Sequence, residues 1–155
     1  MKSRAIVLLL VSSAFASSTP AIPRSVVTRA VAPDQALICF YRGIDQGSKR
    51  EHYSVRVHDV YVGRLARESF LYHLTAPGRR IVFVEAEVNV SRSFEIRAGE
   101  VHYIRVDRGA RTFPARPKLL RVERTTGVRD LNQLRYSGHP LRGNAMQYCL
   151  QADAF

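Results

Sequence analysis

Hydrophobic and polar residues alternate along the first half of the chain, from residue 36 onward. Successive side chains of a strand point to opposite faces, so this alternation indicates strands with one buried and one solvated face. The same segments are rich in β-branched and aromatic residues, which favour strands. Four strands are predicted here, with a two-residue turn at His58-Asp59: Ala36–Arg42, Tyr53–Val57, Val60–Leu65 and Ser69–Thr75.

The second half continues with further strand segments. Residues 79–88 contain an unbroken apolar run from Ile81 to Val84, which predicts a strand buried on both faces. Residues 90–98 and 101–107 flank Gly99-Glu100 and predict a hairpin, because Gly99 can take a positive φ without steric cost.

The last predicted strand covers residues 118–125, and a short helix is expected near 128–136. Val128, Leu131 and Leu134 recur there at helical spacing, which predicts one or two helical turns. Many short strands separated by turn residues predict an all-β domain over residues 35–155, either a β-sandwich or a small barrel.

The N-terminus has the order of features of a secretory signal peptide. Lys2 and Arg4 precede the apolar run at 5–11, and Ala14 and Ala16 flank a small-residue cleavage site. We therefore expect residues 1–16 to be removed and the mature chain to have no transmembrane span. Residues 17–34 contain three prolines and are predicted to be a linker.

Charge is the most informative feature of the composition. The chain of 155 residues has a net charge of +11, and 21 of its 24 basic residues are arginine. Outward positions on antiparallel strands could align such arginines into a stripe, and guanidinium groups bind phosphate or carboxylate bidentately. The candidate anion-binding residues are Arg79, Arg80, Arg97, Arg105 and Arg121. The alternative is that these arginines reflect composition and serve solubility.

The two cysteines, Cys39 and Cys149, are the next candidates. In an oxidising compartment two cysteines usually pair, so a disulfide is predicted, with two buried free thiols as the alternative. No Cys-x-x-Cys redox motif is present.

The sequence contains no constellation that indicates catalysis. The five histidines lack metal-ligand spacing, and neither a nucleophile elbow nor a phosphate-binding glycine loop occurs. We expect no catalytic residue, no metal site and no cofactor. Nucleic-acid binding is not expected either, because the chain carries an export signal and no RNA-binding signature.

Four segments together resemble the exported bacterial family known as domain of unknown function 2846. They are the strand pair around Val60, the Ser69-Phe70 step with Pro77-Gly78, the segment 94–106, and the closing segment 116–127. The family usually has Gly immediately before Ser69, where this chain has Glu68. Many members are lipoproteins, whereas no lipid-attachment cysteine follows the apolar run here. The resemblance implies an antiparallel β-sandwich of the transthyretin-like or PEGA-like kind and no known catalytic residue.

These features predict a non-enzymatic interaction module in the periplasm or secreted from the cell. Its partner would be an envelope protein or an anionic lipid or polysaccharide surface, bound through sheet edges or arginines. A purely structural accessory domain and a small metal-dependent enzyme are the alternatives.

Overall fold

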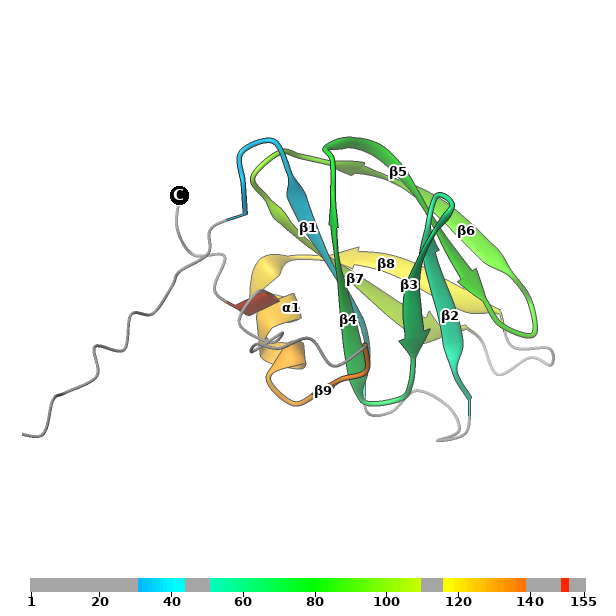
Figure 1. Ribbon diagram of the computed structural model, residues 1–155. Helices are drawn as coiled ribbons and strands as arrows, with labels where there is room; N and C mark the ends of the chain where they lie inside the picture. Colours follow the sequence, from blue (N-terminus) through cyan, green and yellow to red (C-terminus); the bar gives the residue numbers. More distant parts are fainter. Residues whose placement is uncertain (1–30, 44–50, 110–115, 139–148, 151–155) are drawn as a thin grey trace, which may run out of the picture.

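The computed structural model describes residues 31–43, 51–109, 116–138 and 149–150. They form two sheets packed face to face, with one short helix (Figure 1). The first sheet has the order β8-β7-β1-β4-β9 and the second sheet has the order β3-β2-β5-β6. The predicted all-β sandwich is therefore confirmed.

The elements of the first sheet are β1 (Ala36–Arg42), β4 (Ser69–Thr75), β7 (Val101–Arg108), β8 (Pro117–Val122) and β9 (Arg135–Tyr136). Those of the second sheet are β2 (Tyr53–Val57), β3 (Val60–Leu65), β5 (Gly78–Glu85) and β6 (Val90–Ile96). The helix α1 spans Arg124–Leu131. Most neighbours are antiparallel, but β1 pairs with β7 and β4 pairs with β9 in parallel, so the first sheet is mixed.

The apolar side chains between the sheets form the main core. Ile38 and Phe40 of β1 face it from the first sheet, and Val55, Val82 and Val84 face it from the second, all fully buried. The period-two pattern of these strands is what places their apolar residues on this shared face.

A second cluster covers the opposite face of the first sheet. Leu37, Cys39 and Tyr41 of β1 point into it, together with Leu131 of α1 and Leu134 just after the helix. Every residue of β1 is buried: three belong to the main core, three to the second cluster, and the seventh is Arg42 at the end of the strand. Figure 1 shows α1 on the side of the first sheet away from the second sheet.

The helix begins and ends earlier than the predicted segment at 128–136. It starts directly after Glu123, where the pairing of β8 with β7 has stopped at Val122. Gly127 lies so close to the Tyr103 ring that a Cβ atom there would sit 2.4 Å from it, so this turn of the helix requires glycine. Leu134 is buried beyond the helix end, in the turn that leads to β9.

The predicted hairpin around Gly99-Glu100 is wrong. β6 belongs to the second sheet and β7 to the first, so the turn carries the chain from one sheet to the other. Gly99 does take a positive φ, of 72°. The local turn geometry was foreseeable, but the two strands it connects pair with different partners.

The structure also bears on the two ends of the chain. Val31, inside the predicted linker, packs against the second cluster. Cys149 and Leu150 have helical conformation. The predicted signal peptide, including Ala14 and Ala16, lies outside the described residues, as do residues 17–30 of the linker. No helix among the described residues is long and apolar enough to cross a membrane.

Candidate functional site

The three predicted anion-binding arginines of the second sheet and its exit turn have separate surroundings. Arg79 lies on the outer face of β5, with Nη2 3.4 Å from Ser93 Oγ. Arg80 donates to Thr75 Oγ1 at 3.0 Å and to the carbonyls of Ala76 and Pro77 at 2.9 Å each. Arg97 is exposed beyond β6 and forms an ion pair with Glu100, 3.6 Å between Nη1 and Oε1.

Arg105 and Arg121, both on the first sheet, are engaged in other places. Arg105 Nε lies 3.0 Å from both carboxylate oxygens of Asp107, on the same side of the sheet as α1. Arg121 donates to the carbonyl of Glu95 at 2.9 Å and contacts His102 Nδ1.

Arg121 and Arg92 both form hydrogen bonds between the two sheets, although Arg92 is not among the five predicted anion-binding arginines. Arg92 on β6 donates to the Leu119 carbonyl of β8 at 2.7 Å, and Arg121 on β8 donates to the Glu95 carbonyl of β6. The two side chains thus cross the gap between the edge strands of the two sheets. Unpaired carbonyls at sheet edges invite association with other chains, and these guanidinium groups satisfy two of them.

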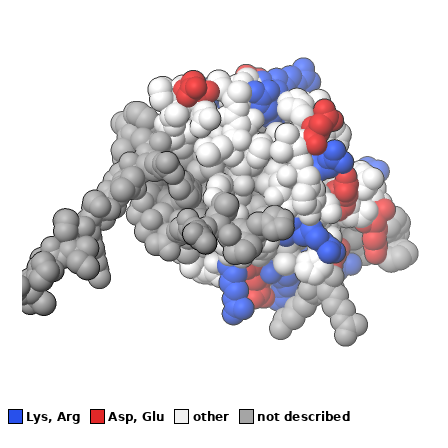
Figure 2. All heavy atoms as spheres, in the orientation of Figure 1, with Lys and Arg blue, Asp and Glu red and all other residues white. Residues whose placement is uncertain are grey.

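The structure therefore does not gather the five predicted arginines into one stripe. On the face in Figure 2, basic and acidic side chains are interspersed around the right and lower margins. Guanidinium groups are used here mainly to hold turns and edges together.

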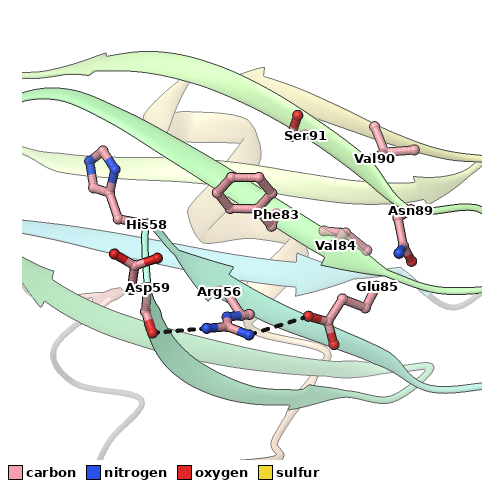
Figure 3. A pocket seen from close by; sticks show the side chains of 9 residues that line it. All are labelled: Arg56, His58, Asp59, Phe83, Val84, Glu85, Asn89, Val90 and Ser91. Atoms are coloured by element: carbon pink, nitrogen blue, oxygen red, sulfur yellow. Dashed lines mark hydrogen bonds and ion pairs between the residues drawn. The ribbon is translucent and has the colours of Figure 1, made fainter.

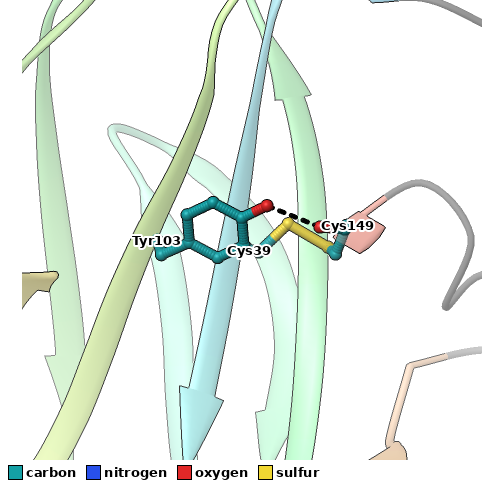
Figure 4. The surroundings of a disulfide bond; sticks show 3 residues. All are labelled: Cys39, Tyr103 and Cys149. Carbon is teal, nitrogen blue, oxygen red and sulfur yellow. Dashed lines mark hydrogen bonds between the residues drawn. A yellow bond between two sulfur atoms is a disulfide. The ribbon is translucent and has the colours of Figure 1, made fainter. Parts of the chain in front are cut away.

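Cys39 and Cys149 form a disulfide, with Cα atoms 6.0 Å apart and 110 residues between them in sequence (Figure 4). Both residues are fully buried in the second cluster. Tyr103 donates its hydroxyl to the Cys149 carbonyl at 2.6 Å. Together these bonds fix Cys149 to the outer face of the first sheet.

A buried charge pair closes the end of β1. Arg42 is fully buried, its Nη2 lies 2.7 Å from Glu51 Oε2, and its guanidinium stacks 4.2 Å above the Tyr53 ring. Tyr53 donates its hydroxyl to the other Glu51 oxygen at 3.0 Å. Burial raises the pKa of Tyr53 to about 12. This group is enclosed by its own partners and has a structural role.

Within the described part of the chain, no three His, Cys, Asp or Glu residues come close enough to hold a metal ion. His102 is buried, with Nε2 accepting a hydrogen bond from the Arg97 amide at 3.0 Å. Burial and the neighbouring Arg121 charge lower the pKa of His102, which favours the neutral ring.

An open site lies on the outer face of the second sheet. It is a hollow of about 450 Å³ across β2, β5 and the start of β6 (Figure 3). Phe83, 37% exposed, lies at the centre of the polar side chains around it. The strand register places Tyr61, Arg56, Phe83 and Ser91 in one row across the sheet, and Tyr61 is 53% exposed.

Some polar groups around Phe83 are held by hydrogen bonds or ion pairs within the protein, and others have hydrogen-bonding capacity left. Arg56 lies 3.6 Å from Glu85 through Nη1 and donates through Nη2 to the Asp59 carbonyl at 3.1 Å. Asn89 uses its carbonyl oxygen to accept from the Ala86 amide at 3.3 Å, which leaves its NH₂ group directed elsewhere. Nε2 of His58 is buried and has no hydrogen-bond partner among the described residues.

Sequence reasoning missed this hollow because it predicted that residues 81–84 are buried on both faces. Only Val82 and Val84 are fully buried, whereas Phe83 faces outward. The signal that could have shown this is the alternation in β5. Arg79 and Glu85 are separated from Phe83 by an even number of positions, so all three side chains point to the same face of the strand.

A second hollow of similar size lies where β3 leads into β4. Arg67, Ser69 and Arg135 line a hollow of about 430 Å³ with Glu68. Glu68 has a φ of 58°, a conformation that side chains with a Cβ seldom adopt. The strained backbone explains why a glycine suits this position.

Residues 32–114, more than half of the chain, match the family described as "Protein of unknown function (DUF2846)". The chain belongs to this family. No match was found among curated proteins or among solved structures. The family description assigns no activity.

Proposed function

We propose that this DUF2846 protein is an exported, non-enzymatic binding module that contacts an envelope component through the outer face of its second sheet. The observation that carries the proposal is the unequal covering of the two sheets. The first sheet is covered on both faces, whereas the outer face of the second exposes Tyr61 and Phe83 beside a hollow. Exposed aromatic residues beside an arginine are the typical composition of binding surfaces.

Export is supported by two independent features. The N-terminal sequence has the order of a signal peptide, and the chain contains a disulfide between Cys39 and Cys149. Disulfides persist in the periplasm and outside the cell and are rare in the reducing cytosol. Both features support the proposal that the protein acts in the periplasm or outside the cell.

The surfaces favour a specific partner over a general anionic surface. Arg80, Arg105 and Arg121, expected to bind anions, already donate to groups of the protein itself. Attraction to phosphate head groups would need several basic residues free on one face. An envelope protein or polysaccharide that contacts the Phe83 row fits the described surface better.

Site-specific photocrosslinking in intact cells tests the proposal. A benzophenone amino acid is placed at Tyr61, on the proposed face, and in a matched strain at Lys118, exposed on the edge strand β8 of the other sheet. We expect a defined adduct with an envelope component from position 61 and none from position 118. Adducts from position 118 alone, or none from either position, would contradict the proposal and favour a purely structural domain.

A further inference from the structure

We propose that the hollow around Phe83 binds an uncharged carbohydrate chain; this inference rests on the proposed function and names the ligand class of the same face. The hollow, about 450 Å³, lies within the usual size range of ligand sites, roughly 300–1,000 Å³. It lies open on the outer face of the second sheet, where an extended polymer can be accommodated as well as a single ring.

The charge of the lining argues against an anionic ligand. Three fully charged side chains line the hollow, one cationic (Arg56) and two anionic (Asp59 and Glu85). Arg56 is already held by Glu85 and by the Asp59 carbonyl. The lining therefore carries one more negative than positive charge although the chain as a whole is +11, so a phosphate or carboxylate would find no net attraction here.

The exposed ring of Phe83 provides an apolar platform. An aromatic face carries negative charge density, and it attracts the weakly positive C–H groups that line one face of a sugar ring. Phe83 is held in place by its strand, because its neighbours Val82 and Val84 are fully buried in the main core. The strand position of Phe83 is therefore fixed before any ligand arrives, which limits the entropy lost on binding.

The polar groups around the ring supply both donors and acceptors. A sugar hydroxyl donates one hydrogen bond and accepts others, so it needs such a mixed lining. Glu85 offers a half-exposed carboxylate, Asn89 an NH₂ donor and Ser91 a hydroxyl. An apolar peptide side chain would leave these groups without partners.

Titration calorimetry of the purified protein with short oligosaccharides tests the inference. The probes are chitotetraose, cellotetraose and maltotetraose, all uncharged, with polygalacturonate as the anionic comparison. We expect saturable binding of at least one uncharged probe, weakened at least tenfold by Phe83→Ala and several-fold by Glu85→Gln. Glu95→Gln is the matched control, because Glu95 is exposed on the same sheet but does not line the hollow. It should leave the affinity unchanged.

Three outcomes would overturn the carbohydrate assignment: no binding of any uncharged probe, binding of polygalacturonate alone, or binding unaffected by Phe83→Ala in a variant that melts like the wild type. Each is separable from failure of the proposed function, because the Tyr61 crosslink in cells would persist if the face binds a protein instead.

Discussion

The two sheets of this protein share one core but differ in what covers their outer faces. On β1 of the first sheet every residue is buried, because α1 and the disulfide-linked C-terminal segment cover the outer side. On β5 of the second sheet, buried and exposed residues alternate, and Phe83 faces the exterior. The same strand chemistry thus gives a structural layer in one sheet and an accessible surface in the other.

Removing the disulfide, which helps to cover the outer face of the first sheet, should cause the largest loss of stability. Cys39→Ala/Cys149→Ala should lower the free energy of unfolding by roughly 3–5 kcal/mol, because a link across so many residues restricts the unfolded chain. Guanidinium denaturation of the oxidised wild type and the variant measures it. A loss below about 1 kcal/mol would mean that apolar contacts alone hold the C-terminal segment on the first sheet.

Truncating one apolar side chain on each outer face compares the sheets directly. Leu37→Ala, under the helix, should cost about 3 kcal/mol as a buried truncation. Phe83→Ala should cost less than about 1 kcal/mol because its ring is partly solvated.

Urea denaturation measures the free energy of unfolding of these variants, and Ile38→Ala is their matched control. It truncates the same strand on its other side, in the main core, and should resemble Leu37→Ala. Equal small losses for Leu37→Ala and Phe83→Ala would show that the helix side of the first sheet is not a true core.

The link between the sheets at β3–β4 offers a smaller, stabilising change. Glu68→Gly should raise the free energy of unfolding by about 0.5–1 kcal/mol, because glycine adopts the observed positive φ without steric cost. The same substitution at Glu95, in an extended strand, should have the opposite sign. Thermal melts of both variants decide this, and a loss of stability in Glu68→Gly would show that the Glu68 side chain outweighs its backbone strain.

The smallest expected effect is the pH dependence of stability that arises from His102, which lies near the edge strands β6 and β8. Burial, and then the Arg121 charge, lower the pKa of His102, which also faces Arg97 and Glu100. Below about pH 6.5 the unfolded chain takes up a proton that the folded chain resists, so stability should fall on acidification. Protonation would also remove the lone pair of Nε2 that accepts from the Arg97 amide.

His102→Gln should make this fall shallower, measured as the change in Tm between about pH 7.5 and about pH 5.5. A part should remain, because burial also lowers the pKa of His73. His52→Gln, at an exposed position, is the control. An unchanged pH profile in His102→Gln would show that this residue does not contribute.

The sequence predicted the individual strands well. Four of them have the bounds expected from alternation, and the cysteine pair is joined as expected. It failed where the answer depended on pairing between distant segments. The prediction of a hairpin at Gly99 was wrong because β6 and β7 join different sheets. The outward position of Phe83 was missed because four consecutive apolar residues do not show which of them point to the core and which point to solvent.

The candidate site was the least predictable part. Arginine side chains are long and find acceptors several residues or strands away, so composition could not show that Arg80 holds a turn or that Arg121 reaches the carbonyl of Glu95. The hollow itself needed the register, which places Arg56 and Phe83 side by side from separate strands.

The amino-acid sequence alone determined the strand segments, the buried face of most of them and the two cysteines available for pairing, because side-chain alternation and turn chemistry act over a few residues. Only the tertiary structure decided which sheet each strand joined, which outer face was covered, and where the arginines found their partners. Those outcomes follow from long-range pairing and packing, which no local pattern encodes.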